Sequence, residues 1–176
     1  MSTVRIVESP IGHIRLEATS HGLTGLRFVD GDVSAAVGHS GDDAARSVLD
    51  QAERELRAYF AGELKRFTVA VAPEGTEFQR RVWILLQTIG FGETRSYIDL
   101  ARSLDLPGGS RAVGGANGAN PIPIIIPCHR VVAADGTLGG FSAGLDRKRW
   151  LLRHEGAGGE VSLFAAGAET ASTIVR

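Results

Sequence analysis

The stretch NPIPIIIPCHRVV, positions 120–132, holds the single cysteine of this 176-residue chain. The apolar runs at 124–126 and 131–133 predict two short buried strands on either side of it. A lone cysteine is most often a small buried hydrophobic residue. Yet Cys128 is followed by His129 and Arg130, which are costly to bury without partners. The segment is therefore either ordinary core or a site with a reactive thiol.

A nucleophilic Cys128 needs help from its surroundings, because a free thiol is only about 3% ionised at neutral pH. His129 is the candidate base, although neighbours in an extended segment point to opposite sides. Contact between Cys128 and His129 would then require a tight turn or a bridging water. Glu155 is the candidate carboxylate behind His129, since an acid in the last turn of a helix opposes the helix dipole.

Upstream of the cysteine, the segment SRAVGGANGA at 110–119 predicts a helix that Ser110 caps. Its glycines at 114, 115 and 118 are poor choices for a stable helix, at about 1 kcal/mol each relative to alanine. A helix without bulky side chains can approach another backbone closely. That backbone is either DNA or another part of the protein, and both alternatives stay open.

Other helices are expected around this one. Thr76 and Gln79 form a capping box before an apolar face that ends at Gly90, and Ser96 caps a helix that runs to position 103. The Leu-Pro-Gly-Gly turn at 106–109 then leads into the glycine-rich helix. Two short helices around such a turn predict a helix-turn-helix, or else a plain helical hairpin. A turn at 135–136 and a final helix over 145–155, ended by Gly156, complete this half.

The first half of the chain has a different pattern. Short strands are predicted at 3–7, 12–18 and 23–29 as an antiparallel meander, followed by a helix over 42–61 and a strand over 67–72. The Pro-Glu-Gly turn at 73–75 marks a domain boundary. We therefore expect an α/β domain over 1–75, a second domain over 76–156, and a loose tail over 157–176.

Composition narrows the class of protein. With 43% hydrophobic residues the chain can bury a core, and the cysteine count allows no internal disulfide, so a cytoplasmic protein is expected. No membrane segment and no metal-ligand or phosphate-loop motif is recognised. Residues 1–78 carry a net charge of −4 and residues 79–155 carry +4. A polyanion would bind the second half.

Together these motifs resemble one family, the O6-alkylguanine-DNA alkyltransferases. The matching text, from position 78 to 156, is FQRRVW, GETRSY, SRAVGGANGANP, IIIPCHRVV and GGFSAGLDRKRWLLRHEG. The resemblance implies a small RNase H-like α/β domain followed by a winged-helix or helix-turn-helix type domain that carries the cysteine. It implies direct-reversal DNA repair, in which a flipped guanine gives its O6-alkyl group irreversibly to the protein. O4-alkylthymine stays open as a second substrate.

The resemblance also assigns roles. Cys128 would accept the alkyl group, His129 and Glu155 would relay the thiol proton through a water, and Asn120 would sit at the hinge before the active-site segment. Arg111 would fill the place of the extruded base, and Tyr97 would lie beside the flipped nucleotide. The DNA- and substrate-binding residues implied are Tyr97, Ser110, Arg111, Gly114, Gly115, Ala116, Asn117, Gly118, Val131, Phe141 and Ser142, of which Val131 and Ser142 would act through backbone groups.

The implied partner is double-stranded alkylated DNA, bound through the minor groove by a monomer, with cooperativity left open. No cofactor and no metal are expected. Two other functions remain as alternatives. One is a DNA lesion sensor whose thiol takes no part, and the other is a thiol hydrolase that uses Cys128, His129 and Asn120. The hydrolase is disfavoured because such triads usually assemble from distant segments.

Overall fold

The computed structural model describes residues 2–31 and 43–157. The first three strands are β1 (Thr3–Val7), β2 (His13–Thr19) and β3 (Gly22–Val29), and they form an antiparallel sheet in the order β1-β2-β3. Buried and half-buried residues alternate along β2, as expected of a strand with one face on a core. The predicted meander is confirmed, with bounds that differ by one residue in β2 and β3.

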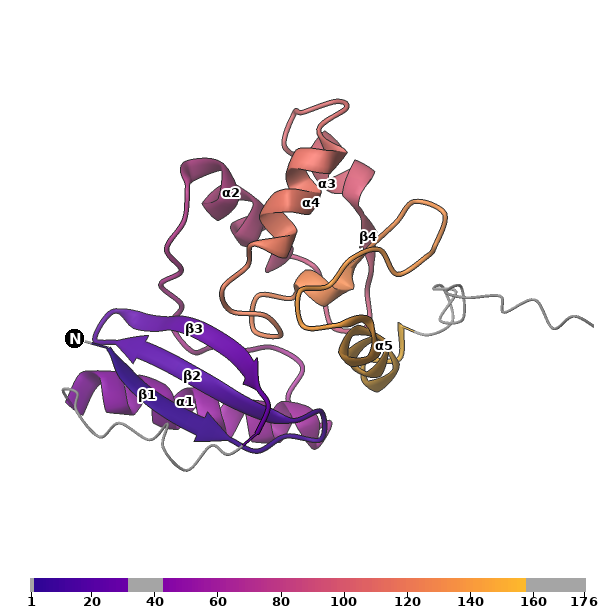
Figure 1. Cartoon of the computed structure of the whole chain (residues 1–176). Helices are drawn as coiled ribbons and strands as arrows, with labels where there is room; N and C mark the ends of the chain where they lie inside the picture. The colour runs from indigo at the N-terminus through magenta and orange to yellow at the C-terminus, as the bar shows by residue number, and fades with distance from the viewer. Residues whose placement is uncertain (1, 32–42, 158–176) are drawn as a thin grey trace, which may run out of the picture.

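Helix α1 (Asp43–Phe60) lies along this sheet, as Figure 1 shows. Its buried residues recur at helical spacing and form one face, which consists of Ala45, Leu49, Ala52, Leu56 and Tyr59. The helix predicted over 42–61 is confirmed within one residue at its C-terminal end. Position 42 lies outside the described residues.

The strand predicted over 67–72 is wrong. Only one isolated bridge forms there, between Leu23 and Val71. The amide groups of Thr68 and Val69 donate instead to the Glu55 carboxylate, at 2.8 and 3.1 Å. A side chain on α1 thus satisfies the backbone groups that a strand would have paired. Pro73 has no amide hydrogen with which to extend the ladder.

The second half begins with α2 (Glu77–Leu86), whose N-cap is Thr76 with the predicted capping box. Strand β4 (Arg95–Ser96) leads into α3 (Tyr97–Ser103), and Ser96 caps α3 as predicted. After the turn comes α4 (Ser110–Gly118), which packs against α3 and α2. The helix-turn-helix arrangement of α3 and α4 is visible in Figure 1.

Two details of these helices differ from the prediction. Ser110 does not cap α4, because the Gly109 carbonyl already accepts the first helical bond from Val113 at 3.0 Å, and this moves the cap to Gly109. Helix α2 ends at Leu86 rather than just before Gly90. Beyond it the chain tightens into turns, in which the Ile89 amide donates to the Leu86 carbonyl at 3.0 Å.

The strand predicted over 124–126 is a buried turn. Ile124 has a φ of 75°, and the Ile126 amide donates to the Ile122 carbonyl at 2.9 Å, so the chain reverses there. A β-branched residue in this region is strained and needs strong support from its surroundings. All three isoleucines are nevertheless buried. An apolar run marks burial correctly but does not distinguish a strand from a turn.

The chain then forms a 3₁₀ turn, η1 (Cys128–Arg130), and strand β5 (Val131–Val132), which pairs in parallel with β4. The predicted turn at 135–136 is present, with Gly136 at a φ of 80°. Helix α5 (Leu145–His154) follows, and Gly156 has the positive φ expected just past a helix end. The tail expected over 157–176 lies outside the described residues, apart from a buried Ala157.

A continuous core connects the sheet and α1 with the helices of the second half. Leu16, Leu26 and Leu56 from the first half belong to the same buried cluster as Ile122, Ile124 and Cys128. The Leu26 amide also donates to the Pro121 carbonyl at 2.8 Å, across the two halves. Among the helices in the described ranges, none has the length and apolar character to cross a membrane.

Candidate functional site

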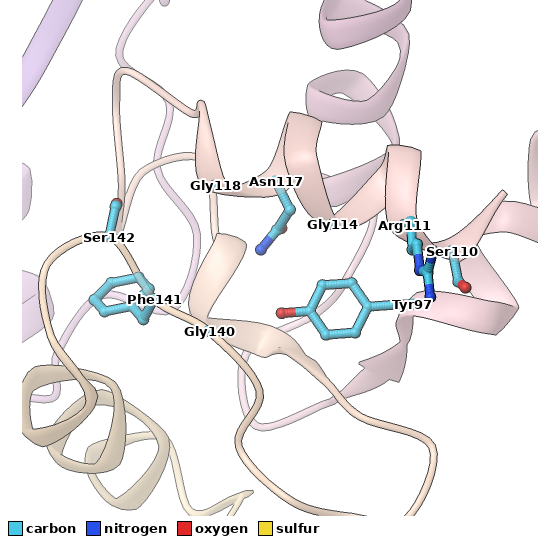
Figure 2. A pocket seen from close by; sticks show the side chains of 9 residues that line it. All are labelled: Tyr97, Ser110, Arg111, Gly114, Asn117, Gly118, Gly140, Phe141 and Ser142. Carbon is cyan, nitrogen blue, oxygen red and sulfur yellow. The ribbon is translucent and has the colours of Figure 1, made fainter.

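A hollow of about 580 Å³ opens between α4 and the loop before α5. Figure 2 shows α4 along one side of it, with the Tyr97 ring and the 140–142 loop along the other. Its lining residues are Tyr97, Ser110, Arg111, Gly114, Asn117, Gly118, Gly140, Phe141 and Ser142. The structure thus brings together most of the residues that the sequence assigned to DNA and substrate binding.

The glycines of α4 leave its outer face bare. A Cβ atom added at Gly115 or Gly118 would meet no described atom within 4 Å, and both residues are exposed. A Cβ at Gly114 would make ordinary contact with the Tyr97 ring at 3.8 Å. Packing within the described part of the protein therefore does not require glycine at 115 and 118. The bare face is available to an external partner.

Three of the residues assigned to binding do not line the hollow, and one of them, Gly115, lies on the exposed face of α4. Ala116 is on the inner face of α4, where its carbonyl accepts a bond from the Trp83 indole at 2.9 Å. Val131 is buried in β5, its amide donates to the Cys128 carbonyl, and its own carbonyl accepts from Lys148. A backbone contact from Val131 to a substrate stays a prediction.

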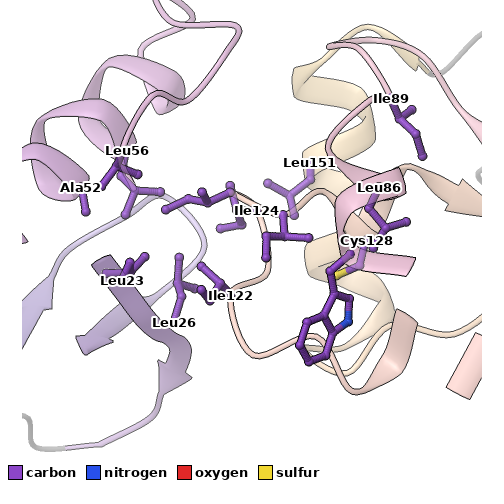
Figure 3. Close-up of a cluster of buried hydrophobic side chains, with 14 of the residues drawn as sticks. Leu23, Leu26, Ala52, Leu56, Leu86, Ile89, Ile122, Ile124, Cys128 and Leu151 are labelled. Atoms are coloured by element: carbon purple, nitrogen blue, oxygen red, sulfur yellow. The ribbon is translucent and has the colours of Figure 1, made fainter. Parts of the chain in front are cut away.

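Cys128 is buried, with 1% of its surface exposed. Figure 3 shows its sulfur among core side chains, near Leu86. The Asn117 amide, from the wall of the hollow, donates to the Cys128 carbonyl at 3.4 Å. The 3₁₀ conformation of residues 128–130 is a tight turn, so the extended geometry that would separate Cys128 from His129 does not apply.

Burial raises the pKa of the Cys128 thiol to about 11, and the Asn120 side chain and the Lys148 charge act against that rise. The thiol is therefore protonated at neutral pH. A reaction at this sulfur needs a group that takes its proton as the new bond forms.

Glu155 is the centre of a buried polar cluster. Its Oε1 lies 2.8 Å from His129 Nε2 and accepts from the Tyr59 hydroxyl at 2.7 Å and from Arg130 Nη2 at 3.0 Å. Its Oε2 accepts from Arg130 Nε at 2.8 Å and from the Gly92 amide at 3.3 Å. Gly92 is required here, because its φ is 80° and a Cβ would lie 2.8 Å from the Glu155 carbonyl oxygen.

These donors decide where the protons lie. Burial acts to raise the pKa of Glu155, but His129 and Arg130 outweigh it and the net shift is downward, so the carboxylate is ionised. The hydrogen between Glu155 and His129 then sits on Nε2 of the imidazole. Burial lowers the pKa of His129, against the pull of Glu155, and the ring is neutral. Its Nδ1 is left as a proton acceptor and has no hydrogen-bond partner among the described residues.

Asn120 holds the turn that precedes the cysteine. Its side-chain amide donates to the Ile126 carbonyl at 2.8 Å, and its side-chain oxygen accepts from the Ile122 amide at 3.0 Å. Both bonds support the strained conformation at Ile124. The imidazole of His129 is oriented by Glu155 rather than by Asn120, and the Cys-His-Asn triad of a thiol hydrolase is therefore not formed.

Two functional candidates were missed from the sequence. Lys148 is fully buried, and its ammonium donates to the Val131 carbonyl at 2.6 Å and the Gly140 carbonyl at 3.1 Å. Burial lowers its pKa to about 8, while the nearby Cys128 acts to raise it. Its spacing of three residues from Leu145 and Leu151 placed it on the apolar face of α5, a signal that could have found it. Tyr59 had no such signal, since it reads as one more core residue of α1.

Comparison with known proteins covers almost all of the described chain. Residues 4–73 match the ribonuclease-like domain of 6-O-methylguanine DNA methyltransferase, and residues 77–157 match its DNA-binding domain. The chain is 49% identical over 152 residues to a methylated-DNA–protein-cysteine methyltransferase of Methanosarcina acetivorans, across 86% of this chain and 97% of the relative. A namesake from Mycolicibacterium paratuberculosis is 48% identical over 155 residues, across 88% and 93%.

Solved structures agree with this assignment. The crystal structure of the Mycobacterium tuberculosis O6-methylguanine methyltransferase superimposes with a TM-score of 0.75 at 44% identity, across 96% of this chain and 97% of that one. A Mycobacterium tuberculosis OGT in complex with DNA also has a TM-score of 0.75, at 45% identity across 88% and 93%. These matches confirm the expected fold, a ribonuclease-like domain followed by a helical DNA-binding domain. The chain belongs to the methylated-DNA–protein-cysteine methyltransferase family, the O6-methylguanine DNA methyltransferases.

Proposed function

We propose that this protein repairs alkylated DNA by taking the O6-alkyl group of a damaged guanine onto Cys128. The observation that carries the proposal is the protonated, buried thiol of Cys128 next to a neutral His129 whose Nε2 is held by ionised Glu155. The hollow, of about 580 Å³, has a volume in the range of small-molecule sites. Family membership points to the same chemistry.

The proposed reaction is a single displacement. The Cys128 sulfur attacks the alkyl carbon, the sulfur–carbon bond forms, and the bond from that carbon to O6 breaks. The thiol proton passes to Nδ1 of His129, through a bridging water, and from there to the departing guanine. A thioether is a poor leaving group, and the chain has no second cysteine to remove it. Each molecule therefore acts once, and no cofactor takes part.

The proposed reaction requires base flipping, because the O6 atom in a duplex and the buried Cys128 cannot otherwise meet. The O6 atom is inside the base stack of a duplex, and Cys128 is buried, with its carbonyl bonded to Asn117 in the wall of the hollow, so the guanine must leave the stack to reach it. We assign the bare face of α4 to the minor groove, and exposed Arg111 to the gap that the base leaves. Tyr97, Phe141 and Ser142 would then surround the flipped nucleotide.

In this proposal the two domains have different roles. Residues 76–156 bind DNA as a monomer and carry the thiol, and residues 1–75 support the buried cluster from behind. The cytoplasm is the proposed location. No contact among the described residues supports O4-alkylthymine as a second substrate. None supports cooperative binding to DNA either.

Intact mass after exposure to duplex DNA that contains O6-methylguanine tests the proposal. The protein should gain one methyl group in place of the thiol proton, and peptide mapping should locate it at Cys128. With excess lesion, repair should stop at one event per protein molecule. Cys128→Ser should bind the same duplex with a similar Kd and gain no mass.

Two results would contradict the proposal. Unchanged mass together with tight binding to the lesion would indicate a damage sensor, the alternative kept from the sequence. Repair of many lesions per protein molecule would exclude irreversible transfer to the thiol.

A further inference from the structure

Tyr59 reaches the catalytic cluster from the other domain. It lies in the last turn of α1, in the ribonuclease-like half, 96 residues from Glu155 in sequence. Its side chain is fully buried, and its ring packs against Phe67 and Phe91, with centroids 5.3 and 6.1 Å away. The His154 ring next to Glu155 also contacts it, and a His154 ring nitrogen lies 2.7 Å from the Tyr59 carbonyl oxygen. The ring thus has little freedom to move.

The hydroxyl of Tyr59 binds the oxygen of Glu155 that also faces His129. Oε1 lies 2.7 Å from the hydroxyl and 2.8 Å from His129 Nε2. The other donors to this carboxylate, Arg130 and the Gly92 amide, come from the second half of the chain. Within the described ranges, Tyr59 is thus the single residue of the first domain that bonds to the catalytic carboxylate.

We propose that Tyr59 is a positioning residue, through which the ribonuclease-like domain holds Glu155 in place and sets the state of His129 for its reaction with Cys128. This inference rests on the proposed relay from Cys128 through His129 to Glu155. It adds a role in alkyl transfer for a domain whose residues otherwise lie outside the site.

The direction of the effect follows from the hydrogen bond. Burial, with the negative charge of Glu155, raises the pKa of Tyr59, so its hydroxyl keeps its proton and always donates. That donation takes up part of the charge on Oε1 and weakens the pull of Glu155 on a second imidazole proton. The remaining charged groups around His129 are Arg130 on the same turn and Lys148 on α5, and both act to lower its pKa. Tyr59 therefore works with them to keep His129 neutral.

Tyr59→Phe tests this role, because it removes the hydroxyl and keeps the ring. The readout is the pH dependence of the transfer rate on free O6-benzylguanine, which needs neither DNA binding nor base flipping. Without the hydroxyl, Glu155 should hold an extra proton on His129 more strongly. The midpoint of the acidic limb should move upward by roughly half to one pH unit, with the rate above that limb within about twofold of wild type.

Phe67→Leu is the matched control. It trims a ring that packs against Tyr59 and leaves the hydroxyl bond intact, so its acidic limb should stay where wild type has it. A uniform loss of rate at every pH in Tyr59→Phe, or an equal shift in Phe67→Leu, would reduce Tyr59 to a packing residue and overturn the inference. Thermal unfolding of both variants should show that each is folded.

Glu155→Gln separates this inference from the proposed function. If Glu155→Gln leaves the pH profile unchanged, the His129–Glu155 relay itself is wrong. If Glu155→Gln changes the profile and Tyr59→Phe does not, the relay stands and only the role of Tyr59 is wrong. In the double variant, Tyr59→Phe should have no further effect, because the charge on which it acts is gone.

Discussion

At the scale of single residues, burial raises the pKa values of the site's acidic groups, and neighbouring donors and charges act against that rise. Burial alone would neutralise Glu155 and keep the Cys128 thiol protonated. Donors from His129 and Arg130 reverse the effect at Glu155, whereas Asn120 and Lys148 only reduce it at Cys128. The carboxylate is thus charged and the thiol is not. This difference favours a mechanism in which the thiol loses its proton during alkyl transfer over one in which a thiolate is present beforehand.

Lys148 supplies a prediction at this scale. Lys148→Met removes the buried charge that acts to lower the pKa of Cys128, together with two bonds to the carbonyls of Val131 and Gly140. We expect the thiol pKa to rise further, and a rise of one unit makes removal of the thiol proton about tenfold less favourable. Transfer should slow by a similar factor on both duplex DNA and free O6-benzylguanine. Stopped-flow rates with the two substrates measure this.

Arg149→Met is the control on the same helix, because Arg149 pairs with Asp146 at 2.8 Å on the surface of α5. Its transfer rate should match that of wild type. Equal rates for wild type and Lys148→Met would show that Lys148 only fills space in the core.

At the scale of elements, the two faces of α4 differ, because one packs on the core and the other is exposed. Val113 and Ala116 are buried against the core, while Gly115 and Gly118 add no side chain to the exposed face that also carries Arg111. Three glycines weaken the helix by several kcal/mol in total at about 1 kcal/mol each, and no described contact needs the two exposed ones. A stability cost without an internal benefit is typical of a surface kept for a partner.

Gly115→Ala tests this surface. The added methyl group meets no described atom within 4 Å, so we expect the free energy of unfolding to rise by about 0.5–1 kcal/mol. On duplex DNA the same methyl group would stand between α4 and the groove, and binding should weaken. Chemical denaturation and DNA titration provide the two measurements. Transfer from free O6-benzylguanine should be unchanged.

Arg111→Ala is the companion variant on the same face. It should slow transfer from saturating duplex DNA and leave the reaction with the free base intact, since only the duplex must lose a base from its stack. If Gly115→Ala lowers both stability and free-base transfer, the glycine serves the fold. Equal losses on both substrates for Arg111→Ala would rule out its role in the flipped gap.

At the scale of the whole molecule, the Glu155 cluster joins the two domains as well as serving the site. Tyr59 of α1 and His129 and Arg130 of η1 meet on this one carboxylate. A buried carboxylate with several donors is stable only while it is ionised. The attachment of the ribonuclease-like domain to the catalytic domain should therefore depend on pH.

The folded-state pKa of Glu155 lies below its usual value of 4.5. Its contribution to stability is thus fully present above about pH 4.5 and is lost as pH falls toward the folded-state pKa. We expect Glu155→Gln to lose about 2–3 kcal/mol of unfolding free energy at pH 7, from weakened bonds to a charged group. The variant should also lose less stability on acidification than wild type. Urea unfolding at pH 7 and pH 3.5 checks both, and parallel acid curves would contradict the prediction.

Most of the helices and strands were predicted correctly from local sequence patterns. Alternation in β2, helical spacing in α1 and the capping boxes at Thr76 and Ser96 act between near neighbours, so they can be read without the fold. The 67–72 and 124–126 segments failed because distant groups decided them. The Glu55 carboxylate took the amides of Thr68 and Val69, and the side chain of Asn120 stabilised the reversal at Ile124.

The sequence by itself determined which thiol could react, because Cys128 is the only cysteine of the chain, and it pointed to His129 as the candidate base. It also indicated Glu155, from an acid in an unfavourable place at a helix end. Only the tertiary structure decided that Tyr59 contacts Glu155, that Lys148 lies near Cys128, and that burial raises the pKa of the thiol. These depend on desolvation and on contacts between segments far apart in the chain, and neither burial nor long-range distance is encoded in local spacing.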